Sequence, residues 1–328
     1  MRPFQYSRAR TLADAEQMLA PEEATAVAGG TNLLDLMKLQ VETPERLVDI
    51  NRLGMTEIRE TANGGLRIGA LATNTATAND ERVRADYPVL ARAILAGATQ
   101  QLRNRATTGG NLCQRTRCYY FTNIDQPCNK REPGSGCGAI DGIAHLHAVL
   151  GTSPSCIATY PGDMAVALSA LDATVEIASP ENDERSVPVR DFHLLPGDTP
   201  WRENVLERGE IITAVTLPRP VKAKHLYRKV RERSSYAFAL VSVAAIVAVE
   251  DGVIARADLA FGGLAHKPWY DPRIADALIG QAPSDDLYDT AADLLLEDAQ
   301  GHGENEFKIP LARRTLAAVM AEATETEI

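Results

Sequence analysis

The five cysteines of this 328-residue chain all lie within one short segment, residues 111–160. They are Cys113, Cys118, Cys128, Cys137 and Cys156, with 4, 9, 8 and 18 residues between successive members. This spacing contains no Cys-x2-Cys pair of the kind found in zinc ribbons and bacterial ferredoxins. The glycines and prolines between the cysteines suit a loop wrapped around a metal cluster better than a zinc knuckle. From the residues alone an iron–sulfur cluster, a zinc ion and unrelated free thiols all stay open.

Composition narrows the class of protein. The chain starts Met1–Arg8 with no apolar run behind it, so we expect no secretory signal and thiols that are reduced or metal-bound. The longest apolar stretch, residues 236–249, is too short to span a bilayer, and we expect no membrane insertion. A net charge of −10 without a basic block argues against nucleic acid or an anionic membrane as a partner.

The pattern of apolar residues and turns predicts an α+β protein in three regions. A helix at Thr11–Leu19 is followed by a strand, turn, helix and strand, a β-turn-α-β unit of about 50 residues. A second region begins near Thr56. Pro218–Pro220 is the best linker candidate, and Asp251-Gly252 predicts a hairpin turn in the region beyond it. The other predicted strands are 24–28, 46–50, 66–70, 173–178, 224–232, 237–249 and 254–261, and the other predicted helices are 33–38, 87–97, 163–171, 285–300 and 310–322.

Two glycine motifs are candidates for binding phosphate. Ala28-Gly29-Gly30-Thr31-Asn32-Leu33 joins a predicted strand to a predicted helix, where backbone amides and the helix N-terminus favour a pyrophosphate. Thr107-Thr108-Gly109-Gly110-Asn111-Leu112 repeats its character, so two such loops can clamp one extended cofactor. The alternative is a pair of simple tight turns, since neither motif is the Gly-x-Gly-x-x-Gly of a dinucleotide-binding unit.

Single polar residues carry less information. Asp163 precedes a predicted helix and is read from its position as an N-cap, and Lys229 is read as a solvated lysine on a strand. His145 and His147 are expected to pack at the surface or in the core rather than to bind metal. The spacing supports no catalytic triad and no pair of catalytic carboxylates, so we predict no catalytic residue on this chain.

Taken together, these motifs resemble the flavin-binding subunit of the molybdenum-dependent xanthine oxidase family over essentially the whole chain. The resemblance rests on the two glycine motifs, on Gly162–Leu168 and on the Lys229 strand. Gln114–Phe121, with Cys128–Arg131 and Pro133–Cys137, is similar to an insert in the flavin subunit of bacterial periplasmic aldehyde oxidoreductases, which carries a 4Fe-4S cluster. A similar insert, with a different intervening sequence, is found in flavin subunits of the 4-hydroxybenzoyl-CoA reductase type.

The resemblance implies a two-lobed FAD-binding domain of the vanillyl-alcohol-oxidase (PCMH-like) type, with lobes at 1–55 and 56–220 and an iron–sulfur insert at about 113–157. A C-terminal domain at 221–328 is expected to hold a three-stranded antiparallel sheet and helices. The implied FAD-binding residues are Val27, Ala28, Gly29, Gly30, Thr31, Asn32, Leu33, Leu34, Thr107, Thr108, Gly110, Asn111, Asp163 and Lys229.

The resemblance also assigns roles to these residues. The pyrophosphate is expected on the first glycine loop, Asp163 at the polar part of the cofactor, and Lys229 near the flavin ring. The implied cluster ligands are Cys118, Cys128, Cys137 and Cys156, which leaves Cys113 as the spare thiol.

The implied function is electron transfer within an aldehyde oxidoreductase. A heterotrimer is expected, in which this chain is the FAD and 4Fe-4S subunit. A molybdopterin large subunit oxidises the aldehyde, and electrons pass through the 2Fe-2S centres of a small subunit to FAD in this chain and then to an external acceptor. The alternatives are a subunit of a 4-hydroxybenzoyl-CoA-reductase-like enzyme and a zinc-stabilised binding module. Location follows the partner: periplasmic if a small subunit with a twin-arginine signal carries the complex out, and otherwise cytoplasmic.

Overall fold

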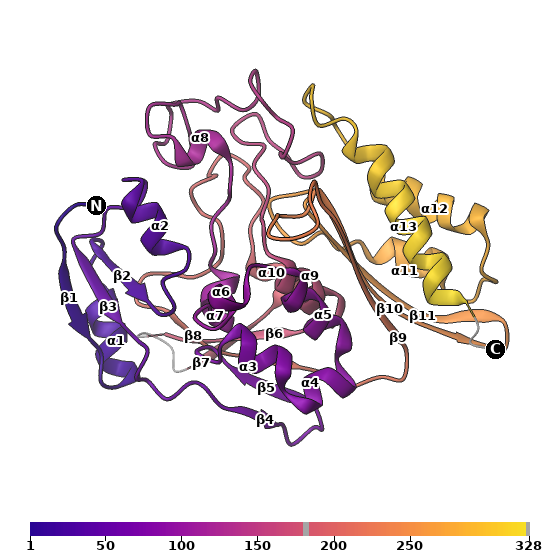
Figure 1. Cartoon of the computed structure of the whole chain (residues 1–328), viewed down its shortest axis with the longest axis horizontal. Helices are drawn as coiled ribbons and strands as arrows, with labels where there is room; N and C mark the ends of the chain where they lie inside the picture. The colour runs from indigo at the N-terminus through magenta and orange to yellow at the C-terminus, as the bar shows by residue number, and fades with distance from the viewer. Residues whose placement is uncertain (180–183, 326–328) are drawn as a thin grey trace.

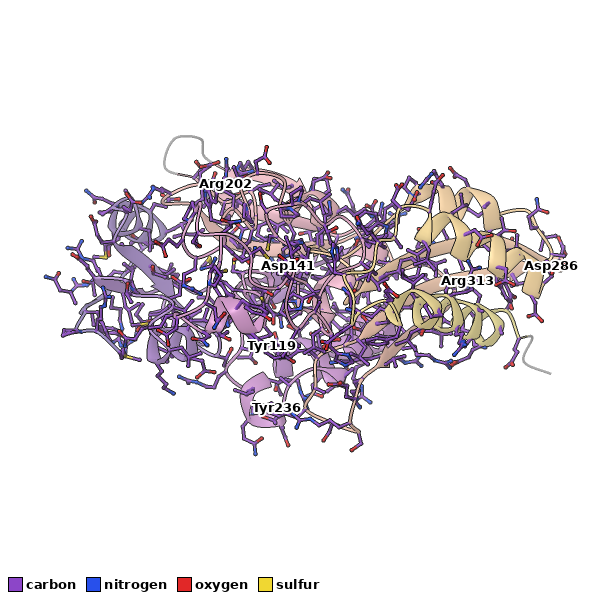
Figure 2. All side chains as sticks on the ribbon, turned by 90° about the horizontal axis from the view of Figure 1, so that it is seen from above. Tyr119, Asp141, Arg202, Tyr236, Asp286 and Arg313 are labelled. Atoms are coloured by element: carbon purple, nitrogen blue, oxygen red, sulfur yellow. The ribbon has the colours of Figure 1, made fainter. Side chains whose placement is uncertain are left out.

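The computed structural model of the chain describes residues 1–179 and 184–325. Three sheets follow one another along an elongated molecule, with the N-terminal sheet at one end and the C-terminal sheet at the other (Figure 1). Figure 2 shows Asp286 and Arg313, from the C-terminal helices, at the end farthest from the N-terminal sheet. The predicted α+β class is confirmed. The predicted domain boundaries at residues 55 and 220 fall between strands of different sheets and stay a proposal.

The N-terminal sheet is parallel, with β3 between β1 and β2. The predicted helix begins where expected, because the side chain of Thr11 accepts a hydrogen bond of 3.1 Å from the amide of Asp14. Strand β1 was not predicted, since its residues are largely exposed and lack apolar alternation. The elements are β1 (Gln5–Arg8), α1 (Leu12–Leu19), β2 (Ala24–Val27), α2 (Leu33–Lys38) and β3 (Arg46–Asp49).

The central sheet has five antiparallel strands in the order β4-β5-β8-β6-β7. Its middle strand, β8, was not predicted, although its run Ile-Ile-Thr-Ala-Val-Thr-Leu is almost wholly buried. The strands are β4 (Ile58–Glu60), β5 (Leu66–Gly69), β6 (Thr174–Ala178), β7 (Glu184–Pro188) and β8 (Ile211–Leu217). The helices of this region are α3 (Asn74–Asn79), α4 (Glu81–Asp86), α5 (Pro88–Ala96), α6 (Gln100–Arg103), α7 (Thr108–Leu112), α9 (Asp163–Ala170) and α10 (Val189–Phe192).

The cysteine segment forms a long excursion from the central region, drawn in magenta at the top of Figure 1. Its regular structure is limited to α8 (Tyr119–Thr122), and the rest is turns and extended backbone. Its loop character was predicted from its glycines and prolines. Such a loop has a small apolar core of its own, so its conformation depends on other contacts.

The C-terminal sheet is antiparallel in the order β11-β10-β9, and this predicted three-stranded sheet is confirmed. Asp251 and Gly252 both have positive φ (50° and 80°), which is the predicted hairpin turn. Helices α11, α12 and α13 cover one face of this sheet, while α5 and α9 lie against the other (Figure 1). The elements are β9 (Lys224–Val230), β10 (Val241–Glu250), β11 (Val253–Gly262), α11 (Pro272–Leu278), α12 (Asp285–Leu296) and α13 (Lys308–Thr324).

Burial on both faces explains the unbroken apolar run of β10. Val243 and Ala245 face the C-terminal helices, whereas Ala244 and Ile246 join the core of the central region. The strand begins at Val241, four residues later than predicted, because residues 236–240 form a loop at the protein surface. Among the described residues, none of the helices has the length and apolarity that crossing a bilayer requires.

Candidate functional site

A cleft of about 540 Å³ lies among the N-terminal region, the central region and the loop between β9 and β10. Side chains from α2, α5 and α7 line it, together with residues 229–238. Six of the predicted FAD-binding residues line this cleft: Thr31, Asn32, Gly110, Asn111, Asp163 and Lys229. The structure therefore brings together residues that are up to 198 positions apart in the sequence (Thr31 to Lys229).

The other eight predicted residues are not part of this lining, and Leu34 among them is exposed. They are Val27, Ala28, Gly29, Gly30, Leu33, Leu34, Thr107 and Thr108. The hydroxyl of Thr107 accepts a hydrogen bond from the Gly110 amide and so caps α7, and buried Thr108 donates to the carbonyl of Ala72. Gly30 has a φ of +72°, which favours glycine at the start of the turn into α2.

The two glycine loops are neighbours in space. The backbone at Gly29 lies against the carbonyl of Arg105, and a Cβ at this position would overlap that oxygen. The side-chain oxygen of Asn32 accepts a hydrogen bond of 2.8 Å from the amide of Arg115, just beyond the second loop. Both loops therefore face one cleft with a fixed separation, as one clamped cofactor requires.

Two buried amide atoms in the lining lack a hydrogen-bond partner within the described residues. These atoms are Nδ2 of Asn32 and Oδ1 of Asn74. A buried polar atom without a hydrogen bond costs about 1–3 kcal/mol, so the cleft is built to be completed by a polar ligand. Asn74 was not predicted, because its position in the first turn of α3 carries no motif.

Asp163 and Lys229 form a buried ion pair at the floor of the cleft. Lys229 Nζ lies 2.8 Å from Asp163 Oδ2, and the side chains are 4% and 9% exposed. Tyr227 donates a 2.6 Å hydrogen bond to the other oxygen of Asp163, and burial beside this carboxylate raises the pKa of the tyrosine well above its usual range. Two readings based on position alone were wrong: Gly162 is the N-cap of α9, and Lys229 is not solvated.

The four predicted cluster ligands surround one small cavity in the cysteine segment. They are Cys118, Cys128, Cys137 and Cys156. Cys128 and Cys137 pair as an isolated antiparallel bridge, which brings two separate turns of the loop together. The side chains of Cys137 and Cys156 interact, which lowers the pKa of Cys137 and raises the pKa of Cys156.

The four thiols are free cysteines that share a cavity. Across residues 1–179 and 184–325, no three or more His, Cys, Asp or Glu side chains are gathered closely enough to hold a single metal ion. Cys113 lies elsewhere, at the C-cap of α7, and lines a separate cavity beside His193. Burial raises the pKa of the Cys113 thiol to about 12, so it stays protonated.

Two histidines contact this thiol cavity. Nε2 of His147 lies 3.1 Å from Cys118 Sγ, and Nε2 of His266 lies 3.3 Å from Cys156 Sγ. Burial lowers the pKa of both imidazoles. The sequence predicted only a packing role for His147 and did not predict its contact with Cys118. His266 was not singled out, because it lies 110 residues from Cys156 in the sequence. His145 instead pairs with Glu232 near the surface.

A charged network fastens the cysteine segment to the rest of the protein. Glu203 lies between Arg115 and the buried Lys130, whose Nζ is 3.0 Å from the carboxylate. Lys130 also donates a 2.7 Å hydrogen bond to the carbonyl of Pro200, and Arg115 also pairs with Glu42. The arginine and lysine charges lower the pKa of Glu203 despite its burial. The network thus links the cysteine segment to Glu42, which precedes it in the sequence, and to Glu203, which follows it.

A narrow cavity separates the cleft from the thiol cavity. Arg117 and Asp163 line both this narrow cavity and the cleft. Cys118 lines both this narrow cavity and the thiol cavity. Cys118 is thus the predicted ligand that faces the cleft most directly.

Comparison with known proteins defines the class. The model of the FAD binding domain in molybdopterin dehydrogenase matches residues 2–220, and that of the CO dehydrogenase flavoprotein C-terminal domain matches residues 225–323. The chain belongs to the FAD-binding subunits of the molybdenum hydroxylase family, and it is an oxidoreductase subunit. The family resemblance predicted from the sequence is confirmed, as is FAD as a cofactor of the matched domain.

Among individual relatives, the aldehyde oxidoreductase FAD-binding subunit PaoB of Escherichia coli K12 is 56% identical over 98% of this chain and 99% of its own length. The carbon monoxide dehydrogenase medium chain of Afipia carboxidovorans is 25% identical over 94% of this chain and 92% of its own. Among solved structures, quinoline 2-oxidoreductase from Pseudomonas putida 86 matches with a TM-score of 0.74 and 26% identity, covering 98% of this chain and 97% of that one.

Proposed function

We propose that this chain is the FAD and 4Fe-4S electron-transfer subunit of a molybdenum-containing aldehyde oxidoreductase. In the proposed heterotrimer, a molybdopterin subunit oxidises the aldehyde, and electrons reach this chain through a 2Fe-2S small subunit before they pass to an external acceptor. The aldehyde oxidoreductase assignment is supported by the 56% identity to the E. coli subunit of that name over nearly the full length of both chains.

The cleft supports the proposed placement of FAD. The pyrophosphate is proposed to lie on Gly29–Asn32, with Thr107, Gly110 and Asn111 contributing from the second loop. The unpartnered amide of Asn32 supports this, because a phosphate oxygen is the acceptor that it lacks. Asp163 and Lys229 are proposed to meet the polar part of the cofactor and the flavin ring. When bound, FAD supplies the exchange between one-electron and two-electron transfer.

The residues that line the thiol cavity support the proposed iron–sulfur site, because they include four cysteine side chains. Four cysteines are the usual ligands of a 4Fe-4S cluster, and the four thiols here share one cavity. The single observation that carries the proposal is the narrow cavity between the two sites. Cys118 and Asp163 both line this cavity, which supports a close approach of the two proposed sites.

The proposal is tested on the purified complex, by its absorption spectrum, iron count and FAD content. We expect flavin bands with a broad iron–sulfur shoulder. Cys128→Ser is expected to lose the iron of this subunit and keep FAD, whereas the control Cys113→Ser keeps both. Full FAD with undiminished iron in Cys128→Ser would contradict the ligand assignment. A colourless protein that contains zinc would instead support a zinc-stabilised binding module.

The direction of electron flow and the location of the complex are tested separately. Turnover of aldehydes and not of aryl-CoA substrates is expected; the reverse would favour a subunit of a 4-hydroxybenzoyl-CoA-reductase-like enzyme. We also propose export to the periplasm with a signal-bearing small subunit. Fractionation of cells that express the whole complex tests this, and recovery of the assembled complex in the cytoplasm would contradict it.

A further inference from the structure

We infer that His147 and His266 are positioning residues that donate hydrogen bonds to the sulfurs of Cys118 and Cys156, and that the C-terminal domain uses them to raise the reduction potential of the site in the insert. The inference rests on the proposed iron–sulfur function and goes beyond it, because it assigns a role to residues outside the four cysteines.

His147 is held in place by the C-terminal domain. Its side chain is buried, and its Nε2 lies 3.1 Å from Cys118 Sγ. Its backbone carbonyl accepts hydrogen bonds from Lys308 Nζ at 2.8 Å and from Asn305 Nδ2 at 3.3 Å. Both donors are 0% exposed; Lys308 is the first residue of α13, and Asn305 lies just before that helix. The backbone that carries this ring is therefore held by buried contacts from outside the insert.

His266 belongs to the C-terminal domain itself, in the segment that follows β11 (Val253–Gly262). It is 8% exposed, and its Nε2 lies 3.3 Å from Cys156 Sγ. The backbone of the same segment anchors the second half of the insert, where the carbonyl of Leu264 accepts from the amides of Val149 and Leu150. The contact between ring and sulfur is thus part of a built interface between the C-terminal domain and the insert.

The proton on each ring can be assigned from its surroundings. In both histidines Nδ1 is buried and has no hydrogen-bond partner within the described residues. A proton on Nδ1 would therefore be an unsatisfied donor, whereas a proton on Nε2 finds a sulfur acceptor. The favoured tautomer in each case is the one that donates to the cysteine.

Hydrogen bonds to sulfur change a redox equilibrium in a defined direction. Reduction puts more negative charge on the thiolate sulfurs, so an N–H donor stabilises the reduced state more than the oxidised state. Loss of either donor should therefore lower the potential. The two donors act on Cys118 and Cys156, while no histidine contacts Cys128 or Cys137 within the described residues.

The test uses the intact complex with His147→Leu and His266→Leu, and with the corresponding Gln variants, which keep an amide donor. The reduction potential of the cluster is measured by redox titration monitored by electron paramagnetic resonance, beside the iron and FAD content. Each Leu variant is expected to shift the reduction equilibrium roughly tenfold toward the oxidised state, about 59 mV for one electron. Each Gln variant should recover part of the shift. His225→Leu is the control, because His225 is a buried histidine on β9 with no hydrogen bond to its ring within the described residues.

The possible results separate this inference from the proposed function. Unchanged potentials in both Leu variants, with full iron, would overturn the inference and leave the cluster assignment standing. Loss of iron from the Leu and Gln variants alike would also overturn it, because the histidines would then act as ligands or as packing. If Cys128→Ser keeps the full iron content, the proposed cluster ligands are wrong. Both the proposed iron–sulfur function and this inference then lose their basis.

Discussion

Gly29 packs against the backbone carbonyl of Arg105, so closely that no side chain fits between them. This contact joins the loop after β2 to the loop that leads into α7 (Thr108–Leu112), and it sets the distance between the two glycine motifs. The neighbouring atoms belong to the backbone, so they cannot move aside as a flexible side chain would.

Gly29→Ala is therefore expected to force the two loops apart. Overpacking of this kind costs roughly 1–3 kcal/mol, and we expect the loss to appear in FAD affinity, measured by fluorescence titration of deflavinated protein. Gly54→Ala is the matched control, since its φ of +74° causes backbone strain while no atom lies within 4 Å of an added Cβ. Equal loss of FAD affinity in both variants would show that the contact with Arg105 has no special role.

The ion pair of Asp163 and Lys229 should be sensitive to the loss of one partner. Asp163→Asn or Lys229→Met leaves the remaining charge buried, a change that typically costs roughly 3–5 kcal/mol. Removing both charges should cost less than the sum of the single changes. Denaturant unfolding of the four proteins, without FAD, gives the coupling as a double-mutant cycle, and additive losses would contradict it.

Glu203 is expected to stabilise the insert because its carboxylate compensates the positive charges of Arg115 and Lys130. Glu203→Gln should lower the free energy of unfolding by roughly 2–3 kcal/mol, less than for a fully buried pair because Glu203 is 22% exposed. Glu207→Gln is the control: its pair with Arg202 is largely exposed and is worth about 0–1 kcal/mol. The two variants should differ in thermal unfolding and in proteolysis of the insert; equal, small effects would show that the network is not stabilising.

His193 predicts a loss of stability in mild acid. Burial lowers the pKa of His193 from 6.5 to about 4, while its Nε2 donates to the carbonyl of Leu112. Between these two pH values the unfolded chain binds a proton that the folded chain does not, so the free energy of unfolding falls as the pH falls from 6.5 to 4. The stability lost between these two pH values is roughly 3 kcal/mol.

His193→Gln removes this titration and keeps an amide donor for Leu112. The difference in unfolding free energy between the wild type and the variant should shrink as the pH is lowered from 7 toward 4.5, measured by urea denaturation. A difference that is constant over this range would contradict the assignment.

Local structure was largely predictable from the sequence, and long-range contacts were not. Thr11 correctly predicted the start of its helix, and Asp251-Gly252 correctly predicted the hairpin turn, because caps and turns depend on neighbouring residues. The roles of Asp163 and Lys229 were expected through family resemblance, but their ion pair joins residues 66 positions apart and depends on the packing of α9 (Asp163–Ala170) against the C-terminal sheet.

The polar surroundings of the cysteines show the same limit. His266 lies in a segment without a motif, and only the fold brings it to Cys156. Strand β8 (Ile211–Leu217) and the unpartnered Asn74 were also missed, since a short apolar run or a single amide does not by itself indicate its neighbours.

The buried contacts of Asn305 and Lys308 with the carbonyl of His147 also constrain the order of events during synthesis. The donors follow that carbonyl by 158 and 161 residues, so the cysteine segment leaves the ribosome long before the residues that hold it are made. A nascent chain therefore carries an incompletely supported thiol cavity until α13 (Lys308–Thr324) has folded onto β10 (Val241–Glu250). Loading of the proposed cluster is then a step for the completed polypeptide, and we expect a chain truncated before α13 to lose the proposed cluster although it keeps all four cysteines.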